Sequence, residues 1–416
     1  MSNEIYKNKD LCKVRTITTF LTLQKDKNTW ENELLEACDF CEELSGKFIE
    51  ENYEVQSIRI VTNAFGEYLD TSSVSSAKKD LELISSILDK SRTSLRIRFA
   101  IGEAKTFDEV DLLAELILAF GDLANACVNI SLDENEILDN DLIVQSVKAV
   151  KKISEITPRG EGNFNFTVNF NCKPFIPYFP ASYHNSNLEN SYVLGLETPD
   201  LLVEVLKEFN DKNPNLSHNE AMASYSKILK EALSYHCKNI KEILDKFEEK
   251  NENKTSFVFK GIDSSAAPSK NCSSMVEVYK QMGLDSFGRS GTVEISSLLT
   301  KVFKSVKELP LVGFSGLMLA VVEDEGLALG TINKDFDIRT LLTNSAICGI
   351  GLDTVPIEGD TPNKKIEQIM RDTGTMAYRL NKPLTVRLFP VPGLKEGDIT
   401  KFESDDLCNS AVLTLP

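Results

Sequence analysis

The sequence predicts an α/β protein with a largely parallel sheet. Short runs of β-branched and aromatic residues alternate with amphipathic helical segments through residues 1–160, and the alternation resumes after them. No linker long enough to separate independent domains interrupts the pattern. Because strands that alternate with helices form right-handed β-α-β crossovers, we expect one large β/α domain over residues 1–416.

Four strand–helix units are expected in the first part of the chain. Residues 14–20 (VRTITTF) are rich in the β-branched residues that favour strands, and a Leu-, Glu- and Phe-rich helical segment follows at 30–50. Further strands are predicted at 55–62, 95–101 and 127–132, and further helices at 76–90, 107–124 and 138–156.

The second part of the chain continues the pattern with one long interruption. Residues 164–171 (FNFTVNFN) alternate as a strand does. The region 198–250 is helical throughout and ends in a charged run, so it is predicted to be a helical insertion or an outer layer. Later strands are predicted at 191–196, 256–262 and 384–391, and later helices at 273–283 and 293–307.

The composition is that of an acidic globular protein, 42% hydrophobic and 26% charged. A formal net charge of −17 opposes binding to nucleic acid or to an anionic membrane, so neither is expected as a partner. The nine cysteines are an odd, scattered set, unlike a disulfide framework, and no signal or membrane-spanning segment is visible. We therefore expect a cytoplasmic protein that binds a small molecule and forms a homo-oligomer, a dimer by default.

Five segments after strands or apolar stretches concentrate polar groups, and ligands of parallel β/α folds bind at such strand ends. In the first, three prolines stiffen the loop 172–184, which ends at His184, and Glu197 follows the next strand. Both are candidate acid/base groups, and an imidazole is also a metal ligand. A histidine that only caps a packed aromatic cluster is an equal alternative.

The second and third segments hold hydroxyl and carboxylate groups. Asp263 and Ser264 follow a strand and could bind a cation or a polar substrate, although helix capping is the commoner role of such residues. Ser315 lies between two glycines, but Leu317 stands where a nucleophile elbow requires glycine, so a serine hydrolase is not expected. Glu323 ends an apolar run and is a candidate metal ligand or a residue of a solvated turn.

The fourth segment, residues 348–360, is predicted to be a loop, because it contains three glycines and a proline. Its Gly-x-Gly lacks the third glycine of a dinucleotide fingerprint. Cys348 is either a reactive thiol or an inert core residue, and Asp353 and Asp360 are expected to point into one pocket and hold a cation. In the fifth segment, Arg387 projects from a buried strand, which requires an acidic partner in the pocket.

Motifs in these segments carry a family resemblance that extends over the whole chain. They are VRTITTF, FIPYFPASYH with GLE, GIDSSAAPS, GFSGLMLAVVED, CGIGLDTVPIEGDT and NKPLTVRLFPVPG. Together they resemble the uncharacterised domain-of-unknown-function family 711. The resemblance implies a fold similar to the ten-stranded β/α barrel of pyruvate formate-lyase and anaerobic ribonucleotide reductase, and it implies no activity. The radical glycine motif of glycyl radical enzymes is absent, so a radical reaction through Cys348 is disfavoured.

The favoured hypothesis is a non-radical enzyme that acts on a small polar or anionic metabolite inside the barrel. Its candidate catalytic residues are His184, Glu197 and Cys348; its candidate substrate-binding residues are Ser264, Ser315 and Arg387; and its candidate ligands for Mg²⁺ or Ca²⁺ are Asp263, Glu323, Asp353 and Asp360. A non-catalytic metabolite-binding or regulatory protein with the same pocket is the alternative, so whether the protein is an enzyme is left open.

Overall fold

The computed structural model describes residues 5–251 and 256–416. It contains a nine-stranded mixed sheet in the order β7-β6-β1-β2-β3-β4-β5-β9-β8. The strands are β1 Lys13–Leu21, β2 Ser57–Thr62, β3 Arg96–Glu103, β4 Asn125–Ile130, β5 Phe166–Phe170, β6 Ser191–Glu197, β7 Val258–Asp263, β8 Gly351–Glu358 and β9 Leu384–Val391. The helices are α1 Trp30–Glu50, α2 Val74–Leu88, α3 Phe107–Phe120, α4 Asn140–Ile156, α5 Pro199–Lys212, α6 His218–Lys250, α7 Met275–Gln281, α8 Thr292–Phe303, α9 Glu325–Ile332, α10 Ile338–Ser345 and α11 Asn363–Arg379. The predicted α/β class is confirmed.

Strands β1–β5 form a parallel half of the sheet, and α1–α4 connect them. Strand β2 is buried along its whole length, as expected for a parallel strand covered on both faces. Its isoleucines Ile58 and Ile60 pack in the main core, whereas the next residue, Val61, belongs to a separate small cluster with Phe20 of β1. The sheet interior is therefore a second packed layer, distinct from the layer beneath the helices.

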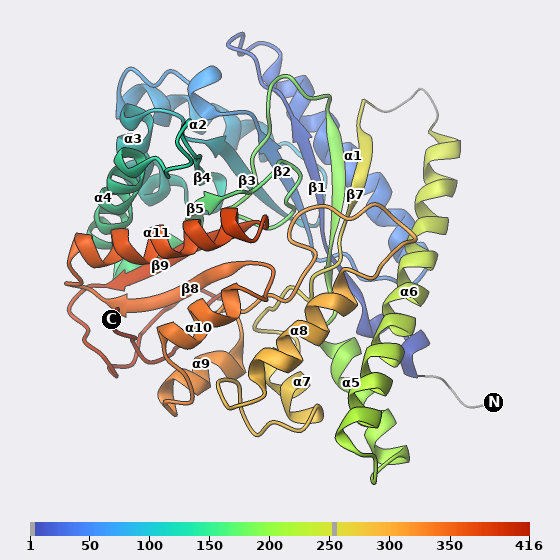
Figure 1. The fold of residues 1–416 in the computed structure, drawn as a ribbon. Helices are drawn as coiled ribbons and strands as arrows, with labels where there is room; N and C mark the ends of the chain where they lie inside the picture. Colours follow the sequence, from blue (N-terminus) through green and yellow to red (C-terminus); the bar gives the residue numbers. More distant parts are fainter. Residues whose placement is uncertain (1–4, 252–255) are drawn as a thin grey trace.

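The remaining strands run against this half. Strand β6 pairs antiparallel with β1, and β9 pairs antiparallel with β5, while β7 and β8 lie parallel beside them. The outermost strands make isolated parallel bridges to one segment, Ile262 with Leu311 and Ala320 with Asp353. In Figure 1, β8 and β9 cross the middle of the molecule with α11 along them and α8–α10 below. Full closure into a ten-stranded barrel stays a prediction.

The prediction of a loop at residues 348–360 is wrong, because most of this segment is strand β8. Its Pro356 has no N–H for a ladder, but β8 is the outermost strand of the sheet, where proline is tolerated. A register shift between Leu352 and Val355 accommodates Thr354, which has a φ of 46°. Such bulges re-aim neighbouring side chains, here that of Asp353.

The helical region 198–250 consists of two helices, α5 and α6, with a break at Pro214. Helix α6 begins with a capping box between Ser217 and Glu220 and runs to Lys250. It packs on α1, α5 and α8, and Figure 1 shows it along one flank of the molecule. This position agrees with an outer layer around the sheet.

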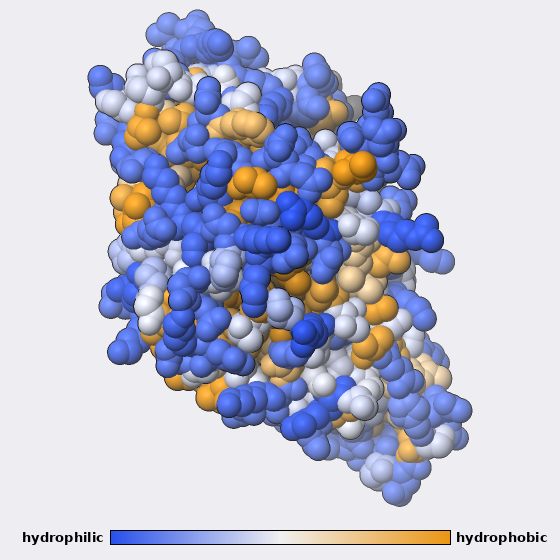
Figure 2. Space-filling model, turned by 60° about the vertical axis from the view of Figure 1, so that its left-hand side comes forward, coloured by the Kyte–Doolittle hydropathy of each residue, from blue (hydrophilic) through white to orange (hydrophobic). Residues whose placement is uncertain are grey.

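The surface is mostly polar. Figure 2 shows hydrophilic residues over most of one face, with hydrophobic ones scattered between them. None of the helices in the described residues has the length and apolar character that crossing a membrane requires.

Candidate functional site

A small cavity of about 40 Å³ lies inside the sheet. Its wall consists of Arg15, Arg59, Arg98, Phe164, Thr167, Tyr178, Phe179, Pro180, Ala181, Ala267, Pro268, Phe314, Met318, Ala320, Glu323, Ile350, Asp353, Thr385 and Arg387. Each of the five segments singled out in the sequence contributes residues to this wall. The volume holds roughly three water molecules, which is the size of a small oxyanion.

The wall carries four arginines from four strands of the sheet. Arg59 of β2 and Arg98 of β3 are directly paired in the parallel ladder, so their side chains leave the same face. Arg15 lies at a register shift of β1 between Val14 and Thr16, which turns it toward the same space. Arg387 enters from β9 on the opposite wall.

Arg387 has a complete set of partners. Its Nε donates to Oδ1 of Asp353 at 2.7 Å, and its Nη2 forms an ion pair with Glu323. Its Nη1 donates to the backbone carbonyl of Phe164 at 3.2 Å. The two carboxylates raise the pKa of this guanidinium although burial alone would lower it. The predicted acidic partner of Arg387 is confirmed, and there are two of them.

Arg15 and Arg98 also have acidic partners. Arg15 lies 3.3 Å from Glu197, and Arg98 forms ion pairs with Asp122 and Asp406. The Nε of Arg98 lies 3.3 Å from Asp122 but has no aligned hydrogen bond. These pairs fix both guanidinium groups at the edge of the cavity.

Arg59 differs from the other three, because no carboxylate among the described residues lies within ion-pair distance of it. Its side chain is buried, with 5% of the residue exposed, and its Nη1 donates to the carbonyl of Pro177 at 3.0 Å. The guanidinium lies 5.1 Å from the ring centre of Phe179, and its Nε has no hydrogen-bond partner. Burial, and then the charge of Arg98, lower its pKa well below the ordinary value. This is a buried, uncompensated cation that faces a cavity.

Two carboxylates share one arginine on the opposite wall. Burial raises the pKa of Glu323, Arg387 lowers it, and the neighbouring Asp353 raises it again. Asp353 is 3% exposed. A carboxyl group with a raised pKa in a cavity wall is a candidate for proton transfer.

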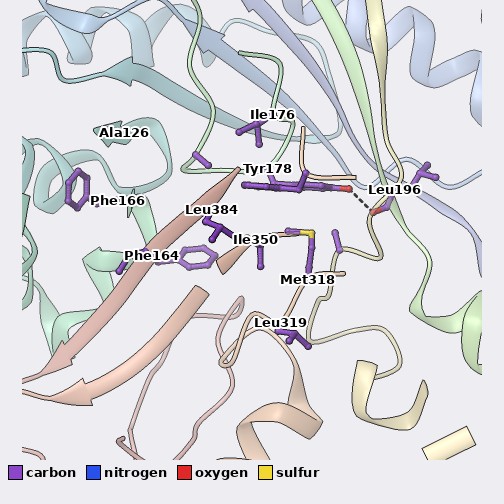
Figure 3. Close-up of a cluster of buried hydrophobic side chains, with 14 of the residues drawn as sticks. Ala126, Phe164, Phe166, Ile176, Tyr178, Leu196, Met318, Leu319, Ile350 and Leu384 are labelled. Atoms are coloured by element: carbon purple, nitrogen blue, oxygen red, sulfur yellow. Dashed lines mark hydrogen bonds between the residues drawn. The ribbon is translucent and has the colours of Figure 1, made fainter. Parts of the chain in front are cut away.

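Apolar side chains close the remaining walls. Figure 3 shows Tyr178 between Ile176 and Met318, with its hydroxyl directed at Leu196. That hydroxyl donates to the Leu196 carbonyl at 2.9 Å, and burial raises the pKa of the phenol well above its ordinary value. Water reaches this space poorly, so charges inside it interact more strongly than they would in bulk solvent.

The three predicted catalytic residues do not meet. Glu197 lies next to the cavity but is held in ion pairs with Lys13 and Arg15. His184 is buried against Phe20, outside the cavity wall, and neither of its ring nitrogens has a hydrogen-bond partner among the described residues. Burial lowers its pKa to about 4. Cys348 is buried away from the cavity wall at the entrance to β8.

The predicted serines serve their own loops. Asp263 accepts hydrogen bonds from the backbone N–H groups of Phe314 at 2.7 Å and Ser315 at 3.0 Å, and from the hydroxyl of Ser265 at 2.6 Å. Ser264 donates to the carbonyl of Phe303 and Ser315 to that of Val312, both at 2.8 Å. Burial raises the pKa of Asp263 to about 6 despite these donors. This network tethers the segment that bridges β7 and β8.

The four predicted metal ligands do not form one site. Asp353 and Glu323 bind Arg387, Asp263 is bonded within its loop, and Asp360 is exposed and paired with Lys395. Within the described ranges, no group of three or more His, Cys, Asp or Glu residues is placed to hold a metal ion. The expectation that Asp353 and Asp360 share a pocket is wrong, because Asp353 is buried in β8 beside Arg387 whereas Asp360 follows the strand and is exposed.

Three arginines of the cavity wall were not predicted as site residues from the sequence: Arg15, Arg59 and Arg98. Arg59 and Arg98 lie near the amino ends of their strands, whereas ligand groups were expected at the carboxyl ends. A signal was present, since both alternate with isoleucine in predicted strands, as Ile-Arg-Ile in β2 and Ile-Arg-Phe in β3. An arginine at the inward period of a buried parallel strand indicates a charged interior.

A family model described as "Uncharacterised ACR (DUF711)" matches residues 6–404. The UPF0210 protein of Oenococcus oeni is 24% identical over 302 residues, which are 71% of this chain and 63% of the relative. The UPF0210 protein of Thermoanaerobacter is 25% identical over 338 residues, which are 78% of this chain and 72% of the relative. The match therefore spans less than two thirds of the Oenococcus protein's own length.

Among solved structures, the anaerobic ribonucleotide reductase from Thermotoga maritima with citrate in the active site is similar, with a TM-score of 0.47 and 10% identity. The likeness covers 90% of this chain and 80% of that chain. At this level it carries no argument about the chemistry of the cavity.

Proposed function

The chain belongs to the DUF711 family of uncharacterised proteins, and we propose that it binds a small anionic metabolite in the cavity between β1–β3 and β9 and converts it by acid–base chemistry. The whole protein's activity is proposed on this site alone, because no relative contributes a reaction.

One observation carries the proposal, the uncompensated guanidinium of Arg59. Removing an ion from water costs several kcal/mol even after the protein relaxes, and a buried charge is normally paired. Among the described residues, the contacts of the Arg59 guanidinium are a hydrogen bond to a backbone carbonyl and a cation–π contact with an aromatic ring, and none is an ion pair. A bound oxyanion would supply the missing partner, and it would also reach the free Nε of Arg98.

The chemistry is assigned to the opposite wall. Glu323 is a buried carboxyl group whose pKa is raised, and it lies in the cavity wall, so it is the candidate group for taking and returning a proton. Arg387 and Asp353 hold it in place and tune its charge. Since both carboxylates already bind Arg387, a divalent cation is not part of the proposal.

A thermal-shift titration of the full chain with sodium acetate, formate and phosphate at constant ionic strength tests the binding. We expect saturable stabilisation by at least one of these anions and its loss in Arg59→Met. The matched control is Arg339→Met, which removes an exposed guanidinium of α10 far from the cavity wall. An absence of stabilisation in the wild type, or equal stabilisation in Arg59→Met, overturns the proposal.

Turnover separates an enzyme from a non-catalytic binding protein. Incubating the protein in D₂O with a stabilising carboxylate that carries hydrogen on the carbon next to the carboxylate, such as acetate, and following exchange of that hydrogen by NMR tests for proton transfer. We expect exchange that Glu323→Gln abolishes while binding persists. Binding without exchange would instead assign the protein to the non-catalytic alternative.

A further inference from the structure

The charged groups around the cavity fall into sets that balance and sets that do not. Lys13 and Arg15 face Glu197 and Asp200, which leaves no net charge in that set. This set is electrically neutral, so it does not require a charged ligand to balance it.

The second balanced set lies on the neighbouring strand. Arg96 and Arg98 share Asp122 and Asp406, so two cations face two anions. The cavity is therefore left with only two unbalanced groups among the described residues.

Those two groups have opposite sign. Arg59 on β2 is a single positive charge with no carboxylate partner, and the set of Arg387, Asp353 and Glu323 carries one negative charge in excess. They do not form an ion pair with each other, yet Glu323 is among the charges that act on Arg59. Both groups belong to the cavity wall.

From this arrangement we propose that the ligand is a small zwitterion of the α-amino acid class, with its carboxylate on Arg59 and its ammonium on Glu323 and Asp353. The inference rests on the proposed function and narrows its substrate class. A zwitterion satisfies both unbalanced groups at once, whereas a simple anion satisfies only one.

Free atoms on both walls match the two ends of such a ligand. The Nε atoms of Arg59 and Arg98 have no aligned hydrogen-bond acceptor, and they come from directly paired strand positions. Arg387 takes Oδ1 of Asp353 and Oε1 of Glu323, and the second oxygen of each carboxylate has no donor among the described residues. The cavity wall therefore offers N–H donors to the carboxylate of a ligand and carboxylate oxygens as acceptors to its ammonium group.

The size and the apolar wall restrict the side chain of the ligand. A cavity of about 40 Å³ has room for about three water molecules, so the wall must move to admit any member of the class, and it moves least for glycine or alanine. Met318, Ile350 and Phe164 offer an apolar surface to a hydrogen or methyl group and no further charge. Amino acids with long or charged side chains require a larger movement of the wall.

Isothermal titration calorimetry of the full chain with alanine, propionate and ethylamine tests the inference. Propionate keeps the carboxylate of alanine but lacks the ammonium, and ethylamine keeps the ammonium but lacks the carboxylate. We expect alanine to bind at least tenfold more tightly than either, and leucine to bind at least tenfold more weakly than alanine.

Two variants assign the ends of the ligand. In Glu323→Gln, which keeps an oxygen for Arg387, we expect the preference for alanine over propionate to fall at least fivefold. We expect neither alanine nor propionate to bind to Arg59→Met, whereas both should bind to the control variant Arg339→Met as they do to the wild type.

The outcomes distinguish the two proposals. Equal affinity for alanine and propionate in the wild type means that Glu323 is protonated and compensates its own set, which overturns the zwitterion but leaves the anion site standing. Binding of neither alanine nor propionate overturns both. Unchanged selectivity in Glu323→Gln also overturns the placement of the ammonium.

Discussion

The same substitution, arginine to methionine, is expected to change the free energy of unfolding differently at two arginines of the cavity. Arg387→Met would leave the buried carboxylates of Glu323 and Asp353 next to each other without their shared cation. Breaking a buried pair by removing one partner costs about 3–5 kcal/mol. Arg59→Met would instead remove a charge that has no carboxylate partner, so the desolvation cost of that charge disappears.

The losses at Arg59 are limited to two contacts. The hydrogen bond to Pro177 is worth about 1.5–3 kcal/mol for a charged donor, and the contact with the Phe179 ring about 1 kcal/mol. The Pro177 carbonyl also accepts from Thr18 at 3.4 Å, so it is not left without a donor. Against these losses stands relief of the several kcal/mol that an unpaired buried ion costs. Arg59→Met should therefore stay within about 1 kcal/mol of the wild type.

Urea and thermal unfolding, monitored by circular dichroism, measure this difference in buffer free of small carboxylates, phosphate and amino acids. For a chain of 416 residues, about 2.1 cal/mol/K per residue gives a Tm shift of roughly 1 °C per kcal/mol. The Tm of Arg387→Met should therefore be about 3 °C or more below the Tm of Arg59→Met. If Arg59→Met loses as much stability as Arg387→Met, then Arg59 has a charge partner in the folded protein, and the reasoning is refuted.

Three further predictions concern residues outside the cavity wall. Burial lowers the pKa of His184 to about 4, so the unfolded chain binds a proton that the folded chain lacks between pH ~6.5 and ~4. As the pH is lowered through this window, stability falls by up to about 1.4 kcal/mol per pH unit. His184→Leu should flatten that slope in urea titrations across this window, and an unchanged slope would mean that His184 is not a buried neutral group. Asp263→Asn places an amide donor against the N–H of Phe314 and should cost about 1–3 kcal/mol in urea unfolding; a neutral effect would contradict the tethering role of Asp263. Asp360→Asn removes an exposed ion pair with Lys395 and should change stability by less than about 1 kcal/mol and leave ligand binding unaltered; lost binding would return Asp360 to the site.

The sequence predicted the order of most strands and of helices α1–α8 well because hydrophobic periodicity is a local property, whereas helices α9, α10 and α11 were not predicted. Strands β1–β7 and β9 all appear near their predicted positions. Strand β8 was missed, since Gly351 and Pro356 are loop signals whose cost depends on neighbours that only the tertiary fold supplies. At an outermost strand with a bulge, those residues are compatible with a β-ladder.

The structure brings residues of the five predicted polar segments together, but it gives several of the predicted site residues other partners. The five polar segments do meet at one cavity, and Arg387 does have acidic partners. Residue type alone, however, could not show that Asp263 spends its oxygens on backbone N–H groups, or that Asp360 faces solvent. Which donors and cations surround a carboxylate depends on three-dimensional packing, and the neighbouring residues in the sequence do not reveal it.

The same dependence explains why four arginines on one cavity have different roles. Arg387 joins β9 to β8 and to the segment before α9, so its charge is used to build the wall. Arg15 and Arg98 hold acidic partners from other elements and fix the edge. Of these four, Arg59 is the one that is buried without a carboxylate partner among the described residues, and a protein that keeps such a group forgoes stability that an apolar residue would give. The cost is understandable if the missing anion is the ligand, which makes Arg59 the residue on which the function of this cavity is most directly tested.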